Sequence, residues 1–147
     1  MTFSTKSIAS WSIILLILMQ FVPLDRINPP ANPKIQLPPS IKKSLKKACY
    51  DCHSYETQWT KIAYLAPASW LASGIVSSGR TALNFSTLNN NEARAPLLTI
   101  KLNKVVQKAS EHQQLYYLLK PEAQLSKSES NAILQWLNKL QITAIPY

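Results

Sequence analysis

Glycine, cysteine, histidine and methionine are scarce in this chain: each occurs only twice among 147 residues. With two glycines against ten prolines, and with few segments in which polar and apolar residues alternate, the sequence argues against a β-sheet fold. Apolar residues instead recur at intervals of three and four positions, which is typical of helices that pack on one face. A length of 147 residues with 46% apolar content suits one compact domain. We therefore predict a mainly α protein with one folded unit.

Both cysteines and one of the two histidines fall within five consecutive residues, Cys49-Tyr50-Asp51-Cys52-His53. This C-x-x-C-H run is the pattern of covalent c-type haem attachment. Two thiols one helical turn apart can each add to a vinyl group of the same haem, while the adjoining imidazole binds the iron. We therefore predict one covalently attached haem c, held by Cys49 and Cys52, with His53 as the proximal iron ligand.

Other readings of the two cysteines fit the sequence less well. A disulfide between Cys49 and Cys52 would close so short a loop that it would stabilise the fold very little. A zinc site made of both cysteines with His53 and His112 is awkward, because Cys52 and His53 are adjacent and would have to approach one tetrahedral ion together. A thioredoxin-like exchange site would require a βαβ pattern around the cysteines, and the sequence has none.

Methionine, the usual second axial ligand in small cytochromes, is missing from the part of the chain expected to fold. Met1 and Met19 both lie in or before an apolar leader. His112, a lysine, a tyrosine, a water molecule or an empty position remain for the distal side of the iron. His112 precedes the apolar run 115–119 and is the candidate distal ligand, with an ordinary surface histidine as the alternative. Two imidazoles would give a low-spin iron with a lower potential than a His/Met centre.

The N-terminal segment is apolar from Ile8 to Val22, follows a single positive charge at Lys6, and ends at a proline. It predicts an export signal. Bulky side chains at positions 19–23 offer no small-x-small cleavage site, so we expect residues 1–22 to remain as a membrane anchor, although the run is shorter than the ~20 residues of a comfortable span. The folded part is then expected on the periplasmic side of a bacterial inner membrane, or free in the periplasm if the leader is cleaved.

Residues 23–39 contain six prolines in seventeen positions. This density excludes a helix and favours an extended, polyproline-like linker. At about 3.1 Å per residue such a linker could hold the domain up to ~50 Å from the membrane, unless it packs across the domain.

Residues 40–147 are expected to form the haem-binding domain, a small helical unit like a c-type cytochrome with about four helices. The expected helices are Ser40 through the cysteine motif, Pro67 to Ser78, Glu92 or Pro96 to Ser110, and a last one from Ser126 to near the C-terminus. Gly79 is expected to stop the second of them. Ser126 and Glu129 have the spacing of a capping box and predict the start of the last.

The formal net charge of +9 raises the question of an anionic partner. The lysines are spread along the chain and form no basic stripe interleaved with aromatic residues, so we expect no nucleic-acid binding. Lys42, Lys43, Lys46 and Lys47 form a tight group just before the cysteine motif. This group is either a solvated helix face or a docking patch for an acidic electron-transfer partner, and the sequence leaves both open.

Further motifs follow the C-x-x-C-H-Ser run in a fixed order: Glu56-Thr57-x-Trp59, Ala66-Pro67-x-Ser69-Trp70, Gly79-Arg80, Leu83-Asn84-Phe85-Ser86, Tyr117-Leu118-Leu119 with Pro121-Glu122-Ala123, and the final Ser-x-x-Glu helix. Over about residues 22 to 140 the chain resembles the bacterial haem-binding domain family. That family looks like a set of small exported c-type cytochromes, some of them fused to other cytochrome or peroxidase modules. The resemblance implies covalent haem and redox partner proteins for this chain.

The resemblance also gives four residues a candidate role near the haem: Trp59, Trp70, Arg80 and Asn84. Arg80 is the candidate partner of a haem propionate, while core packing, a turn contact or a surface charge are the ordinary alternatives for the four. Family members typically carry a Met-Pro pair where this chain has His112-Gln113. If that methionine is the family's distal ligand, imidazole has replaced thioether here.

The leading hypothesis from the sequence is a membrane-tethered monohaem cytochrome that carries single electrons between redox partners it does not identify. The alternative is a haem-based peroxidase-like enzyme or a gas or redox sensor, which would need an open distal site. The sequence offers no plausible acid/base pair, and with both histidines assigned to iron no imidazole is left to act on a peroxide. A carrier is therefore favoured over an enzyme.

Overall fold

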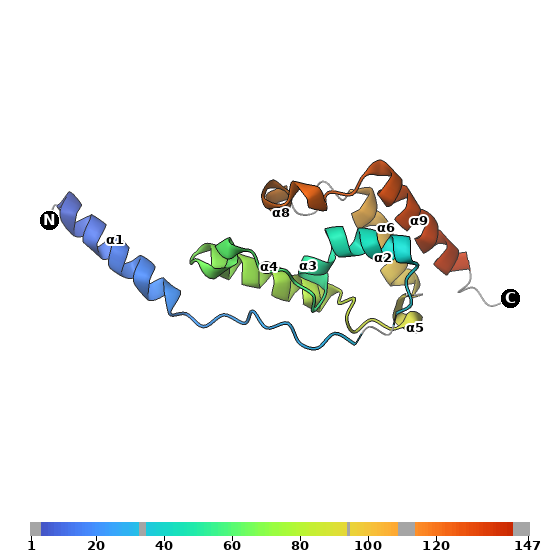
Figure 1. Ribbon diagram of the computed structural model, residues 1–147, viewed down its shortest axis with the longest axis horizontal. Helices are drawn as coiled ribbons and strands as arrows, with labels where there is room; N and C mark the ends of the chain where they lie inside the picture. The colour runs from blue at the N-terminus through green and yellow to red at the C-terminus, as the bar shows by residue number, and fades with distance from the viewer. Residues whose placement is uncertain (1–3, 33–34, 94, 109–113, 143–147) are drawn as a thin grey trace.

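The computed structural model describes residues 4–32, 35–93, 95–108 and 114–142 (Figure 1). Every regular element in these residues is a helix, and none of them forms a strand. The order is α1 (Thr5–Gln20), α2 (Pro39–Ala48), α3 (Tyr50–His53), η1 (Lys61–Tyr64), α4 (Ala68–Ala82), α5 (Asn90–Ala93), α6 (Pro96–Gln107), α8 (Gln114–Leu119), η2 (Pro121–Ala123) and α9 (Lys127–Ile142). The prediction of a mainly α fold is confirmed.

The main hydrophobic core lies where α2, α6 and α9 come together (Figure 1). Its buried members come from the start, the middle and the end of the domain's sequence: Ile41, Leu45, Tyr50, Phe85, Leu88, Ala93, Val106, Ile133 and Leu137. The ring of Tyr50 stacks on that of Phe85 with centroids 5.2 Å apart. Because Tyr50 is the residue after Cys49, this stacking fixes the cysteine motif directly on the core.

The ends of the helices partly follow the expectations. The capping box of α9 is confirmed: the Ser126 hydroxyl accepts from the Glu129 amide at 3.2 Å, and the Glu129 carboxylate accepts from the Ser126 amide at 2.8 Å. The helix α2 begins at Pro39 rather than Ser40. The expected stop at Gly79 is wrong, because α4 continues through it to Ala82.

The third expected helix begins at Pro96, the second of its two expected starts. The short helix α5 ends at Ala93, and α6 begins separately at Pro96, which suits a first helical position because proline has no amide hydrogen to donate. The helix α6 ends at Gln107. Ser110, the expected end, lies outside the described residues.

The proline-rich segment is extended, as predicted, but it lies along the domain (Figure 1). The Asn28 side chain donates to the Thr57 carbonyl at 2.8 Å, and the Arg26 guanidinium donates to the Ala63 carbonyl at 2.9 Å. Further along, the Gln36 amide donates to the Asn90 side chain at 3.1 Å. The segment is therefore a strap bound to the domain, which shortens the reach expected of a free spacer.

The helix α1 projects from one end of the molecule (Figure 1). Its large apolar side chains, from Ile8 to Leu18, are exposed. Within the described residues, no helix combines the length and the apolarity required to cross a membrane.

Candidate functional site

The cysteine motif forms a helical turn of its own. The helix α2 ends at Ala48, and Cys49 separates it from α3 with a backbone φ of −122°. The amides of Cys52 and His53 both donate to the Cys49 carbonyl, at 3.2 and 2.9 Å. This turn places the two cysteines one helical turn apart, and both thiols are free. The spacing required for two thioether bonds to one ring is therefore preserved in the fold.

The imidazole of His53 is oriented by the segment after α4. Its Nδ1 lies 3.1 Å from the Leu83 carbonyl oxygen, and the His53 carbonyl in turn accepts from the Phe85 amide at 2.8 Å. A carbonyl can only accept, so Nδ1 carries the hydrogen and the lone pair of the neutral ring is on Nε2. Such a hydrogen bond to the second ring nitrogen is the usual way in which proteins orient a metal-binding histidine.

Gly79 allows α4 to pack directly on the motif turn. A Cβ atom at this position would lie 2.4 Å from the Cys52 carbonyl oxygen and 3.1 Å from the Cys52 Cβ atom. No side chain fits in this space without moving one of the two helices. Gly79 is therefore a residue of close approach, and its helical conformation explains why it does not end α4.

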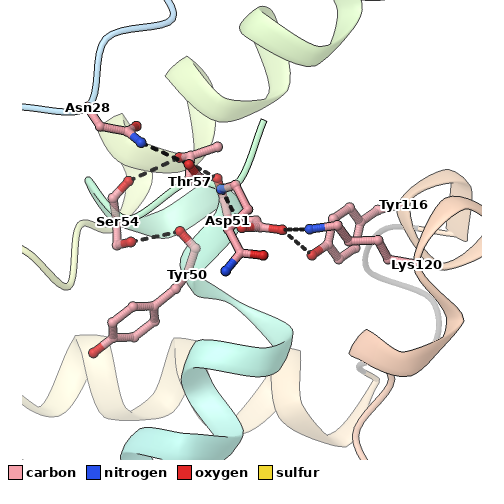
Figure 2. Close-up of polar contacts among 8 residues, drawn as sticks. Asn28, Tyr50, Asp51, Ser54, Thr57, Tyr116 and Lys120 are labelled. Carbon is pink, nitrogen blue, oxygen red and sulfur yellow. Dashed lines mark hydrogen bonds and ion pairs between the residues drawn. The ribbon is translucent and has the colours of Figure 1, made fainter. Parts of the chain in front are cut away.

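Asp51, the second residue between the two cysteines, is the centre of a polar network (Figure 2). One carboxylate oxygen accepts from the Gln58 amide at 2.9 Å, and the Asp51 carbonyl accepts from the Thr57 hydroxyl at 2.7 Å. The Ser54 hydroxyl bonds back to the Tyr50 carbonyl at 2.8 Å. These bonds fold the chain back over the motif turn immediately after His53.

The other carboxylate oxygen of Asp51 holds α8 against the motif turn (Figure 2). It accepts from the Tyr116 hydroxyl at 2.8 Å and from the Lys120 ammonium group at 2.5 Å. Both members of the ion pair are largely buried. Burial, followed by the hydrogen bond to Asp51, raises the pKa of Tyr116, so this phenol stays protonated and donates over the physiological pH range.

Arg80 connects the strap, the motif turn and α4. Its guanidinium donates to the Ser54 carbonyl at 2.8 Å, to the Ile27 carbonyl at 3.0 Å, and to the side chains of Asn28 at 2.7 Å and Thr57 at 2.9 Å. These bonds use four of its five N–H groups. One N–H group remains for the propionate contact, which stays a prediction.

An apolar cavity of about 300 Å³ lies beside Cys52, while Cys49 and His53 are not among its lining residues. Its walls come from η1, α4 and α8 and include Ile62, Leu71, Ile75, Val76 and Leu119. Asp51, Tyr116 and Lys120 also line it, so the polar network forms one edge of the cavity. Ligand sites in proteins have this composition, with apolar walls and a few polar groups.

Trp59 also lines this cavity. Its indole Nε1 is buried, and no acceptor reaches it among the residues that the structure describes. A buried donor without a partner costs about 1–3 kcal/mol, so a native protein rarely keeps one without a reason. This nitrogen is buried rather than exposed to the cavity, so the fit of a ligand depends on the apolar walls. Haem is a ring with a large apolar surface, and the walls beside Cys52 fit it.

The environment of the two thiols bears on the other readings of the motif. Burial raises the pKa of Cys49 to about 12 and that of Cys52 to about 11. Both are neutral thiols at pH 7, and neutral thiols are poor nucleophiles in disulfide exchange. Within the described parts of the chain, no three His, Cys, Asp or Glu side chains come together as ligands for a metal ion.

The other residues named from the sequence are placed differently. His112 lies outside the described residues, and α8 begins two positions after it at Gln114. The Asn84 side chain accepts from the Ser86 amide at 2.9 Å, which is a turn contact. Trp70 lies on α4 and is partly exposed. The structure thus gathers Cys49, Cys52 and His53 on one turn.

Sequence reasoning missed Asp51, Tyr116 and Lys120 as parts of the site. Tyr116 and Lys120 are four positions apart and so share one face of a helix, which is a signal that the sequence does contain. The short distance between Asp51 and that face is set by the packing of α8, 65 and 69 positions away in the chain.

Most of the chain matches a known protein family. A family model described as the haem-binding domain matches residues 14–139. No curated protein and no solved structure gives a significant match. The matched region includes the cysteine motif, the cavity and α9 as far as Lys139.

Proposed function

Because the chain belongs to the haem-binding domain family, we propose that it is a membrane-tethered monohaem c-type cytochrome that carries single electrons. Cys49 and Cys52 would hold the haem through two thioether bonds, and His53 would be the proximal ligand. Haem supplies one-electron chemistry through its Fe(II)/Fe(III) couple. The residues of the chain would attach it and orient the imidazole.

The observation that carries the proposal is the hydrogen bond between His53 Nδ1 and the Leu83 carbonyl. It holds the ring in the tautomer whose Nε2 can bind a metal, within a turn that presents two free thiols at the required spacing. Support also comes from the apolar walls of the cavity beside Cys52, which a haem ring would cover.

For the distal side of the iron we propose His112, since the sequence has no methionine after Met19. We also propose that Arg80 contacts a haem propionate through its remaining N–H group. Both assignments concern how the iron and the ring edge are held, and neither is required for covalent attachment.

A carrier is supported over a peroxidase or sensor by the chemistry at the cavity. The titratable side chains that line it are Asp51, Cys52, Tyr116 and Lys120. Asp51 is occupied by Tyr116 and Lys120, and Cys52 would be consumed by its thioether bond to the haem. An acid/base catalyst must have a titratable group available to the substrate. Since these groups already have partners, the cavity supports a carrier better than an enzyme.

The location we propose is the periplasmic side of a bacterial inner membrane. The exposed apolar side chains of α1 would insert into the bilayer, and the machinery that attaches haem c works on that side. The expected partners are redox proteins of the same compartment.

Attachment is tested by expressing the chain in cells with working cytochrome-maturation machinery and staining a denaturing gel for haem. We expect a stained band for the parent chain and none for a variant with both Cys49→Ala and Cys52→Ala. His53→Ala should keep some covalent haem but lose the parent spectrum. A colourless parent preparation would reject the proposal.

Ligation and carrier function are tested on the same preparation. His112→Ala should convert a six-coordinate low-spin spectrum toward high spin, and an unchanged spectrum would remove His112 from the iron. The untreated protein should titrate as a one-electron couple and should not bind carbon monoxide. Rapid carbon monoxide binding would instead favour the sensor or peroxidase reading, because it requires an open distal position.

A further inference from the structure

One end of the domain exposes a group of large apolar side chains on η1 and the first turn of α4. We call this group the apolar tip: Ile62, Tyr64, Leu65, Trp70 and Leu71, with exposed fractions between 36% and 62%. Five large apolar residues within ten positions form a cluster rather than scattered exposure, and clusters of this kind mark surfaces that contact a partner.

The electrostatics around the apolar tip favour an anionic partner. From Thr57 to Asn91 the sequence has no aspartate or glutamate, and the side chain of Lys61, at the start of η1, is exposed. The strap brings Arg26 over the Tyr64 ring, 4.7 Å from its centroid. Asp25 is the nearby carboxylate of the strap, and its carboxylate oxygen accepts from the Ile27 amide at 3.1 Å. The charge next to the tip is therefore mainly positive.

The apolar tip lies beside the end of α1 (Figure 1). The Gln20 side chain accepts from the Ala66 amide at 3.1 Å and donates to the Ala66 carbonyl at 3.4 Å. Ala66 follows Leu65 and precedes α4, so these two bonds connect the last residue of α1 to the centre of the tip. A bilayer that accommodates α1 would have its surface at this point.

The strap also contacts this end of the domain. The Arg26 guanidinium donates to the Ala63 carbonyl at 2.9 Å, and the Ser73 hydroxyl donates to the Asp25 carbonyl at 3.2 Å. These bonds join the residues that immediately follow α1 to both η1 and α4. The strap therefore places the apolar tip next to the end of α1.

We propose that the apolar tip docks on an anionic phospholipid surface next to the point where α1 enters the bilayer. This inference rests on the proposed tether, and it adds how the domain is oriented on the membrane. Tyr64 and Trp70 are the residue types that concentrate at membrane–water interfaces, and Lys61 would lie among anionic headgroups. Ile62 and Leu71 also line the cavity, so haem would cover them and the contact with lipid would be made by Tyr64, Leu65 and Trp70. Docking of these residues brings the cavity to the bilayer surface. A redox partner embedded in the membrane would then reach it.

The test uses the full haem-loaded chain in vesicles of phosphatidylcholine and phosphatidylglycerol, with a water-soluble maleimide as the probe. Three single variants each introduce one thiol: Ile14→Cys in α1, Leu65→Cys in the tip, and Leu97→Cys in α6. Leu97 is the matched control for Leu65, because the two side chains are 65% and 62% exposed. Substitution of such exposed residues leaves the fold intact. Each reaction rate is divided by the rate of the same variant in urea.

We expect the Ile14→Cys and Leu65→Cys variants to react at least about tenfold more slowly than Leu97→Cys, because interfacial residues are withdrawn from water. The protection at position 65 should fall when phosphatidylglycerol is omitted. If Leu65→Cys reacts as fast as Leu97→Cys while Ile14→Cys is protected, docking is wrong and the tether stands. Protection at position 65 that follows protein density rather than lipid would indicate a second copy as the occupant, and would also overturn the proposal.

The parent chain, which has no added cysteine, distinguishes a failure of docking from a failure of the proposed haem attachment. In it both native thiols should be consumed by the haem, so it should not react with the maleimide. A reactive parent chain would reject covalent attachment. A fast reaction of Ile14→Cys in an unreactive parent background would reject the tether, and with it the docking of the tip.

Discussion

The two halves of the domain bury their apolar side chains in different ways. In the half built from α2, α6 and α9 the apolar residues contact one another, and Leu137 is 0% exposed. In the half built from α3, η1, α4 and α8, apolar residues face a cavity, and Leu71 is 53% exposed. The first half is a closed core, while the second keeps its apolar surface for a ligand.

The cavity half is consequently held together by polar contacts. Asp51 bonds Tyr116 and Lys120 across the cavity edge, and Arg80 bonds the strap and the motif turn. Side-chain hydrogen bonds are directional and can fix two elements at a distance, whereas apolar contacts require the elements to close on each other. A protein that binds a large apolar ring therefore needs polar contacts around the site.

The largest expected effect comes from the closed core. Leu137→Ala should lower the free energy of unfolding by about 2–5 kcal/mol, because it opens a cavity in a packed interior. Leu71→Ala, in the wall of the existing cavity, should cost less than about 1 kcal/mol in the haem-free protein, since little packing is lost there. Urea unfolding followed by circular dichroism measures both. Equal losses would contradict the distinction between the two halves.

The contact between α4 and the motif turn ranks next. Gly79→Ala should cost about 1–3 kcal/mol or more, because its Cβ atom would overlap the Cys52 carbonyl, and covalent haem yield should fall with it. Gly74→Ala is the matched control on the same helix, where a Cβ atom meets nothing within 4 Å. That change should be neutral or stabilise by up to about 1 kcal/mol. The contact would be unimportant if both variants unfolded at the same urea concentration.

A smaller effect is expected at the polar edge of the cavity. Asp51→Asn should cost about 1–2 kcal/mol, because Lys120 loses the charge that it contacts in a largely buried position. Glu56→Gln removes the partner of Lys46 in an exposed ion pair and should cost less than about 0.5 kcal/mol. Urea unfolding of the haem-free proteins compares the two. If Glu56→Gln lowered the free energy of unfolding as much as Asp51→Asn, the buried ion pair at the cavity edge would stabilise the fold no more than an exposed one.

The smallest effect concerns the capping box of α9 and its dependence on pH. Hydrogen bonds from Lys47 and from the Ser126 amide lower the pKa of Glu129 to about 2. The carboxylate is thus favoured by folding, and its stabilisation is present above the unfolded pKa of about 4.3 and is lost as the pH falls toward 2. Glu129→Gln should unfold with a shallower acid dependence and lose less than about 1 kcal/mol at pH 7. Lys47→Met should reproduce much of the change in acid dependence. If both variants lost stability below pH 4 as the parent does, the assignment of this pH dependence to Glu129 would be wrong.

Local features of the fold could be read from the sequence with good accuracy. The helical class, the capping box at Ser126 and the extended proline-rich segment all follow from neighbours within about four positions. The one-turn spacing of Cys49 and Cys52 is equally local. Gly79 was misjudged because a glycine near the end of an apolar pattern predicts a stop, while its actual role depends on Cys52, in a different helix.

The sequence by itself determined the chemistry of the site: which thiols and which imidazole are present, and how far apart they lie on one turn. The tertiary structure alone decided what surrounds them. The Leu83 carbonyl that orients His53 is 30 positions away, the Tyr116 and Lys120 groups that hold Asp51 are 65 and 69 away, and the strap reaches Thr57 from 29 positions before it. A helical turn is fixed by bonds between near neighbours, whereas contacts over such separations exist only after the helices have packed.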